Sequence, residues 1–288
     1  MPAPYDALQV EASPALLEYF LEEYTCAPVD AVSLFTETTR FLATVAVTGL
    51  HLPPSPQVDL MWHAFLADTE NYRRFCHRLG VEYLHHHPTG NNGPHPHARE
   101  LLNYTQFRIQ QVCRTVNPRW WPPHSTPMTG AGAAEFEAHT DWHFTDATRT
   151  GKNPEHTSSG IESAHPPKGL IKRYAVEYAV NESCAEALFF ELDLYLTVRG
   201  HNPHLGPPCA AVDTMWTEFL LFSRAYHQYC ARLGGRLEHT LIPKTRARIA
   251  YHSSAHARTY SILTEHVVGH LGPQRHWWLP PTERHDSM

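Results

Sequence analysis

The hydrophobic positions along the chain recur at the spacing of helices rather than strands. From Val58 to Leu66 the apolar side chains return every three or four residues, which places them on one face of a helix. The segment from Val212 to Leu220 repeats this apolar face. No stretch of useful length alternates apolar and polar residues as a half-buried strand does. The pattern predicts an all-α protein whose apolar stripes form the core.

Start signals divide this pattern into separate helices. Ser13 and Ser55 are each followed directly by a proline. A serine hydroxyl caps a helix by accepting a hydrogen bond from a backbone amide of the first turn, and proline is favoured at the first helical position. The two pairs therefore predict helices that begin at Pro14 and Pro56.

Stop signals show where these helices end and where others lie. Gly49 and Gly80 stand where the apolar pattern breaks, and glycine often follows the last residue of a helix. We expect Asp68 to cap a helix that ends at Gly80, and another helix to cover residues 98–116. These signals predict about five helices in each half of the chain.

The second half of the sequence repeats the first half at a shift of 154 residues. Between residues 58–85 and 212–239, twelve of twenty-eight positions are identical, and the alignment needs no gap until His85 falls on His239. Identity of this extent predicts a tandem duplication of one helical unit.

A weaker repeat extends the duplication toward the end of each copy. The Trp-Trp-Pro-Pro motif at residues 120–123 returns as Trp-Trp-Leu-Pro-Pro at residues 277–281. We expect Trp62 and Trp216 to be buried at equivalent positions, and the two copies to pack as a pseudo-dimer. The predicted boundaries are a first copy at residues 1–124, a linker or surface excursion at 125–165, and a second copy at 166–288.

Composition limits the classes of function. The net charge is −6, and the 23 lysines and arginines form no long run, so no basic stripe is available to bind nucleic acid. No window approaches the roughly 18 uninterrupted apolar residues that a spanning helix needs, which predicts a cytoplasmic protein without a membrane partner. The six cysteines are widely separated and form no Cys-x-x-Cys pair, so a disulfide framework is not expected.

Histidine is in excess, at 23 of 288 residues, and its placement suggests a metal site. Asp59 and His63 are one helical turn apart, while His86 and His87 follow the same helical hairpin. One carboxylate with two imidazoles is the ligand set of non-haem iron sites and of many zinc sites. We predict that Asp59, His63, His86 and His87 supply the ligands of a divalent iron or zinc ion, with His63 and His86 as catalytic residues.

The gapless alignment places these histidines in the first copy only. In the second copy Thr217, Thr240 and Leu241 stand in the places of His63, His86 and His87. Asp59, by contrast, has a counterpart in Asp213, which is most simply explained by packing and by a carboxylate near a helix N-terminus. A site confined to one copy would leave such a correlated loss. The alternative is that His63 binds a backbone carbonyl and that the three consecutive histidines form a polar turn.

A second and weaker candidate lies in the predicted linker. Glu135, Glu137, His139, Asp141 and His143 follow one another at alternate positions. The last two histidines have the helical spacing of metal ligands, whereas the alternation also fits the polar side of a strand. An exposed polar segment without function explains the cluster equally simply.

The first copy carries a set of motifs that resembles a known family. The motifs are Val58-Asp59-x-x-Trp62-His63, then Tyr72-x-x-Phe75-Cys76-x-Arg78-x-Gly80, then His85-His86-His87-Pro88. They resemble a helical family of unknown function, named after plant glycine-rich domain proteins, that also has short bacterial members. Plant members often carry a second histidine where this chain has Phe65, and the glycine-rich region is absent here. The resemblance implies a helical fold and a bacterial-type protein, without a reaction.

Three classes of function are open from the sequence, two of them with supporting features. The first is a metal-dependent enzyme with a mononuclear, histidine-rich site in the first copy and a small-molecule substrate. Iron would suit oxidative chemistry, and zinc would suit hydrolytic or lyase chemistry. The alternative is a non-enzymatic helical adaptor with structural histidines and an interaction surface on the linker. Haem binding through one axial histidine is a third class, for which no local motif argues.

Overall fold

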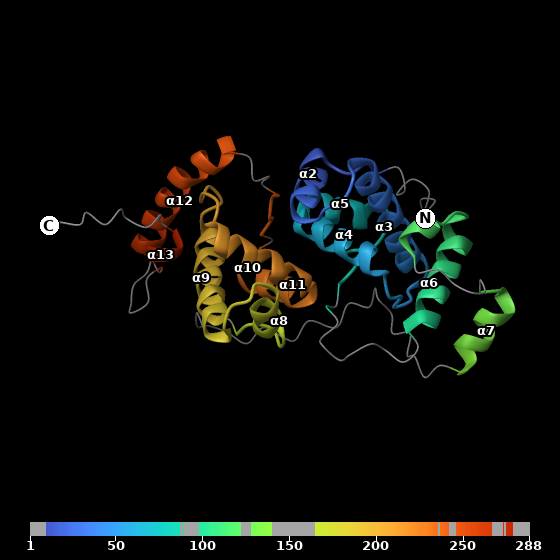
Figure 1. Cartoon of the computed structure of the whole chain (residues 1–288). Coiled ribbons are helices and arrows are strands. Elements are labelled where there is room, and N and C mark those ends of the chain that lie inside the picture. Colours follow the sequence, from blue (N-terminus) through green and yellow to red (C-terminus); the bar gives the residue numbers. More distant parts are fainter. Residues whose placement is uncertain are drawn as a thin grey trace. The chain divides into compact units, whose positions relative to one another are not determined.

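Figure 1 shows the computed structural model of the chain, in which every described element of regular secondary structure is a helix. The structure describes residues 10–86, 88, 98–121, 128–139, 165–235, 237–241, 246–266, 273 and 275–278. These residues contain 12 α-helices and one short 3-10 helix, and they contain no strand. The all-α prediction is therefore confirmed. Among the described helices, none combines the length and the apolar character that crossing a membrane requires.

The chain divides into two compact units. The first unit holds helices α2 to α7 together with residues 239–241, and the second holds α8 to α13 together with His86. Each unit thus includes a short segment that follows a helix of the other unit along the sequence. Within the described residues, the predicted first copy (1–124) holds five α-helices, as expected, and α7 (Gly130–His139) lies in the predicted linker. The predicted second copy (166–288) holds six, because the short helix α13 (Arg275–Trp278) adds one.

The first unit begins its helices at the predicted signals. Its remaining elements are α2 (Pro14–Glu23), α3 (Pro28–Thr48), α4 (Pro56–Ala67), α5 (Thr69–Arg78), α6 (Ala98–Cys113) and the 3-10 helix η1 (Pro118–Trp120). The Ser13 and Ser55 hydroxyls each accept a hydrogen bond from a first-turn amide, as a capping serine should. Gly49 ends α3 in the left-handed conformation, with φ of 67°, which a side chain would strain.

Asp68 precedes α5 but does not cap it in the predicted way. Its side chain makes no capping hydrogen bond to the helix backbone. The carboxylate instead accepts hydrogen bonds from the Ser13 hydroxyl, at 3.0 Å, and from the Asn71 side-chain amide, at 2.9 Å. The residue therefore joins the start of α2 to the start of α5 through hydrogen bonds to a charged acceptor, which are stronger than those between neutral groups.

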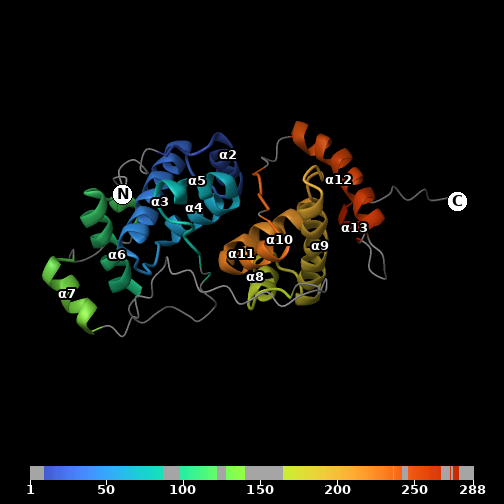
Figure 2. The same cartoon turned by 180° about the vertical axis from the view of Figure 1, so that it is seen from behind.

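The second unit repeats the helix order of the first. Its elements are α8 (Leu170–Glu177), α9 (Glu182–His201), α10 (Ala210–Leu221), α11 (Ser223–Arg232), α12 (Arg246–His266) and α13. The bounds of α4 and α5 recur in α10 and α11 at the shift of 154 residues. In Figure 2 the long helix α9 lies beside α8 and α10, and it also packs on α12. The long helix α3 packs on α2, α4 and α6 in the same way.

Each unit buries one of the two tryptophans that the sequence repeat pairs. Trp62 and Trp216 are 6% and 3% exposed, so both are buried as expected. The indole N–H of Trp62 donates to the Tyr72 hydroxyl at 3.0 Å, and that of Trp216 donates to the Tyr226 hydroxyl at 3.2 Å. Buried indole and phenol groups need such partners because an unpaired polar group in the core destabilises it.

Candidate metal centre

Helix α4 places a carboxylate and an imidazole beside each other. Asp59 lies in the first turn of α4, and His63 follows four residues later on the same face. The Nε2 atom of His63 is 3.3 Å from the Oδ2 atom of Asp59. The two side chains are 12% and 32% exposed respectively, so the pair sits at the edge of the core where an ion from solvent can reach it.

His86 comes from the segment that follows α5, and hydrogen bonds hold it firmly. It is 4% exposed, so it does not belong to an exposed polar turn. Its backbone N–H donates to the Ser223 hydroxyl at 2.9 Å, and its Nδ1 atom lies 3.0 Å from the Leu221 carbonyl oxygen. Because a carbonyl oxygen only accepts, Nδ1 carries the ring proton. The lone pair that could bind a metal is therefore on Nε2.

The structure brings Asp59, His63 and His86 together. Each offers one ligand atom, and the three atoms lie within 4.8 Å of one another. Zinc–nitrogen bonds near 2.0–2.1 Å separate two ligand atoms by about 3 to 4 Å, so the side chains need to draw together only slightly around an ion. Among the residues described by the structure, this is the group that could hold a metal. The fourth predicted ligand, His87, lies outside the described residues.

The contacts of His86 correct the alignment of the two halves. His239 is 3% exposed, and its backbone N–H donates to the Thr69 hydroxyl at 2.9 Å. Its Nδ1 atom lies 2.6 Å from the carbonyl oxygen of Ala67. Ala67 and Thr69 correspond to the residues that bind His86, at the shift of 154. His239 therefore occupies the place of His86, and the gapless pairing of His239 with His85 is wrong.

A one-residue difference in loop length causes this offset. The Tyr72 hydroxyl donates to the Leu84 carbonyl, whereas the equivalent Tyr226 hydroxyl donates to the Leu237 carbonyl. The tyrosines are 154 residues apart and the leucines 153, so the second loop is one residue shorter. The expected replacement of His86 by Thr240 is consequently wrong.

With this register, two of the three triad residues have a sequence counterpart of the same type in the second half. Asp213 and His239 are the counterparts of Asp59 and His86, while Thr217 stands in the place of His63. The Thr217 hydroxyl donates to the Thr214 carbonyl of its own helix at 2.8 Å. The sequence counterparts of the triad therefore differ in residue type at one position, Thr217.

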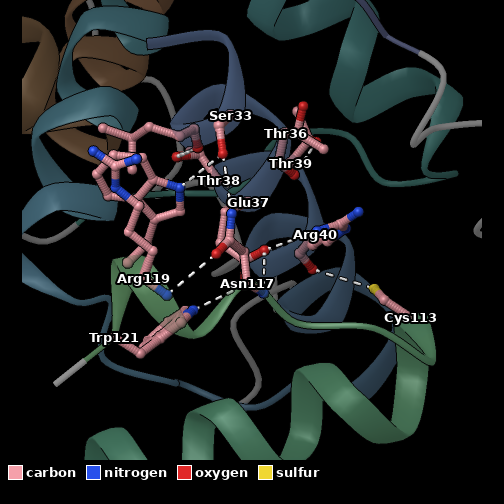
Figure 3. Close-up of polar contacts among 12 residues, drawn as sticks. Ser33, Thr36, Glu37, Thr38, Thr39, Arg40, Cys113, Asn117, Arg119 and Trp121 are labelled. Atoms are coloured by element: carbon pink, nitrogen blue, oxygen red, sulfur yellow. Dashed lines mark hydrogen bonds and ion pairs between the residues drawn. The ribbon is translucent and has the colours of Figure 1, made fainter. Parts of the chain in front are cut away.

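A buried carboxylate that the sequence did not single out organises another part of the first unit. Glu37 is fully buried in α3 and accepts hydrogen bonds from the Trp121 indole at 2.8 Å, from the Asn117 amide at 3.1 Å and from Arg40 at 3.0 Å (Figure 3). This network anchors Asn117 and Trp121 to α3. Three partners satisfy the carboxylate, so its role is structural.

The second unit has an equivalent contact. Glu191 is 4% exposed and lies 154 residues after Glu37. It accepts a hydrogen bond from the Trp278 indole at 2.9 Å. The repeated glutamate at a shift of 154 and the repeated tryptophan motif were the sequence signals that could have revealed both contacts.

The linker cluster and the cysteines offer no competing centre within the described residues. Glu135, Glu137 and His139 lie in helix α7, so the strand interpretation is wrong for them, while Asp141 and His143 fall outside the described residues. Burial raises the pKa of the Cys76 thiol to about 12. That thiol stays protonated near neutral pH and packs as a small apolar group, because the thiolate is the form that reacts and binds metals.

Comparison of the chain with known proteins and structures identifies no relative. No family model, curated protein or solved structure matches the chain. The argument for function therefore rests on the geometry of the site.

Proposed function

We propose that the protein is a metal-dependent enzyme with a mononuclear centre formed by Asp59, His63 and His86. The observation that carries this proposal is the convergence of their three ligand atoms within 4.8 Å. One carboxylate and two imidazoles neutralise part of the charge of a divalent ion and leave further coordination positions for water or substrate. A site with open positions is typical of catalytic rather than structural metal centres.

The ligand set favours iron or zinc as the ion. Two imidazoles and one carboxylate suit Fe²⁺ in oxidative chemistry and Zn²⁺ in hydrolytic or lyase chemistry. A bound ion would activate a small-molecule substrate or a water molecule. In this arrangement Asp59 would supply the negative charge and His63 the imidazole beside it on α4. His86 would bind through Nε2, because its Nδ1–H donates to the Leu221 carbonyl.

We also infer that the two halves arose by duplication of one helical unit and that only the first kept the complete triad. This inference is supported by the repeated bounds of α4 and α5 in α10 and α11 and by the two tryptophan–tyrosine hydrogen bonds. The resemblance to the helical family named after plant glycine-rich proteins rests on sequence motifs alone and stays a prediction.

Metal analysis of protein purified without a histidine tag tests the proposed centre. We expect a stoichiometric divalent metal in the unsubstituted protein, lost in His63→Ala and in His86→Ala. His239→Ala is the matched control because His239 is equally buried and makes the same two kinds of hydrogen bond. That variant should lose stability as His86→Ala does and keep its metal.

Two results would contradict the proposal. The first is a metal content that His63→Ala and His86→Ala leave unchanged. The second is an unsubstituted protein that takes up neither Zn²⁺ nor Fe²⁺, in which case the non-enzymatic adaptor becomes the better hypothesis.

A further inference from the structure

The last residue of α10 and the first residue of α11 make three hydrogen bonds with His86. The Ser223 hydroxyl accepts from the His86 backbone N–H at 2.9 Å and donates to the His86 backbone carbonyl at 3.4 Å. The Leu221 carbonyl accepts from the ring Nδ1 at 3.0 Å. Ser223 is 1% exposed, so its hydroxyl makes these contacts away from bulk solvent. The backbone and the ring of one predicted ligand are thus fixed by a single turn of chain.

We propose that Ser223 is a positioning residue for the metal centre, and that it acts through His86 together with the Leu221 carbonyl. The proposal rests on the proposed function, since it assigns the site a partner that touches neither the ion nor the substrate. Ser223 lies 137 residues after His86 in the sequence, and no sequence motif marks it as part of the site.

The physical reason lies in the direction of the histidine lone pair. A metal–nitrogen bond requires the ion to lie in the plane of the imidazole ring, so the backbone of the ligand and the ring rotation must both be set. The two hydrogen bonds of Ser223 set the backbone, and the carbonyl of Leu221 sets the ring and its tautomer. Loss of such a supporting group weakens metal binding by about 10- to 100-fold in other sites.

The chain contains a matched arrangement that separates positioning from simple stability. The Thr69 hydroxyl accepts from the His239 backbone N–H at 2.9 Å and donates to the His239 backbone carbonyl at 3.1 Å. Thr69 begins α5 as Ser223 begins α11. Because His239 is not a member of the triad, removing the Thr69 hydroxyl should cost stability without weakening metal binding.

Titration of the metal-free protein with Zn²⁺ alone tests the proposal in three variants. Ser223→Ala should raise the dissociation constant by about 10- to 100-fold. Ser223→Thr should bind as the unsubstituted protein does, because threonine already performs this role at position 69. Thr69→Ala should leave the dissociation constant unchanged although its melting temperature falls. Titration with Co²⁺ would show, through its visible absorption bands, whether Ser223→Ala distorts the coordination geometry.

The outcomes separate this proposal from the one on which it rests. If His63→Ala weakens Zn²⁺ binding but Ser223→Ala does not, the positioning role is wrong and the metal centre stands. If Ser223→Ala and Thr69→Ala raise the dissociation constant equally, the effect of Ser223 is merely structural and the positioning role is again wrong. If the unsubstituted protein and His63→Ala bind Zn²⁺ equally, both proposals fail.

Discussion

His86 and His239 are held in the same manner, and yet only one of them meets a pair of further ligands in the part of the chain that the structure describes. Each is buried, each donates Nδ1–H to a carbonyl, and each has its backbone fixed by a hydroxyl at the start of a helix. Only His86 lies within 4.8 Å of both a carboxylate and a second imidazole. The comparison teaches that the buried histidine belongs to the fold, whereas His63 is what adds the candidate chemistry.

Introducing a histidine at position 217 is the strongest test of whether His63 alone distinguishes the two halves. We expect Thr217→His to create a second metal site, because Asp213 and His239 already stand in the places of two ligands. Elemental analysis should then find a second ion per chain. Thr217→Asn, which is polar but a poor ligand, is the control. Unchanged stoichiometry in Thr217→His would show that the two halves differ at more than one side chain.

Removal of a core tryptophan should affect both halves alike. We expect Trp216→Ala to lower the free energy of unfolding by about 3 to 5 kcal/mol, since it removes a large buried ring and leaves Tyr226 without its donor. Trp62→Ala should cost a similar amount. Chemical denaturation measures both. A Trp216→Ala variant that unfolds at the same denaturant concentration as the unsubstituted protein would contradict the equivalence of the two cores.

Replacing each of the two buried glutamates by glutamine should lower the free energy of unfolding by unequal amounts. Glu37 accepts from three groups, Arg40 among them, so Glu37→Gln leaves a partly buried guanidinium poorly paired and should cost about 1 to 3 kcal/mol. In Glu191→Gln the amide oxygen can still accept from the Trp278 indole, and we expect a smaller loss. Denaturation curves of the two variants decide the order. A larger loss for Glu191→Gln would reverse the comparison.

Local signals in the sequence predicted the part of the site that lies on one helix. Ser55 followed by proline fixed the start of α4, and the spacing of Asp59 and His63 placed them side by side because a helix repeats every 3.6 residues. Both predictions needed only the geometry of a single element. The burial of Trp62 followed in the same way from the apolar stripe.

The rest of the site depended on contacts between distant segments. The hydrogen-bond partners of His86 lie 135 and 137 residues away in the sequence, and no local sequence pattern predicts that a backbone carbonyl will be one of them. The identity of His85 and His239 also favoured an alignment without a gap, although a loop shortened by one residue moves the equivalence to His86. The role of Glu37 could not be predicted from local sequence, because it depends on Trp121, which lies 84 residues further on.

The use of a backbone carbonyl at Leu221 bears on how this protein can diverge. Any residue at position 221 would present the same oxygen to His86, so drift there is restricted only by the packing of a side chain that is 4% exposed. Position 223 is different, since only serine or threonine brings a hydroxyl to both backbone groups of His86. Among descendants that retain the triad, we therefore expect various apolar residues at position 221 and a hydroxyl at position 223.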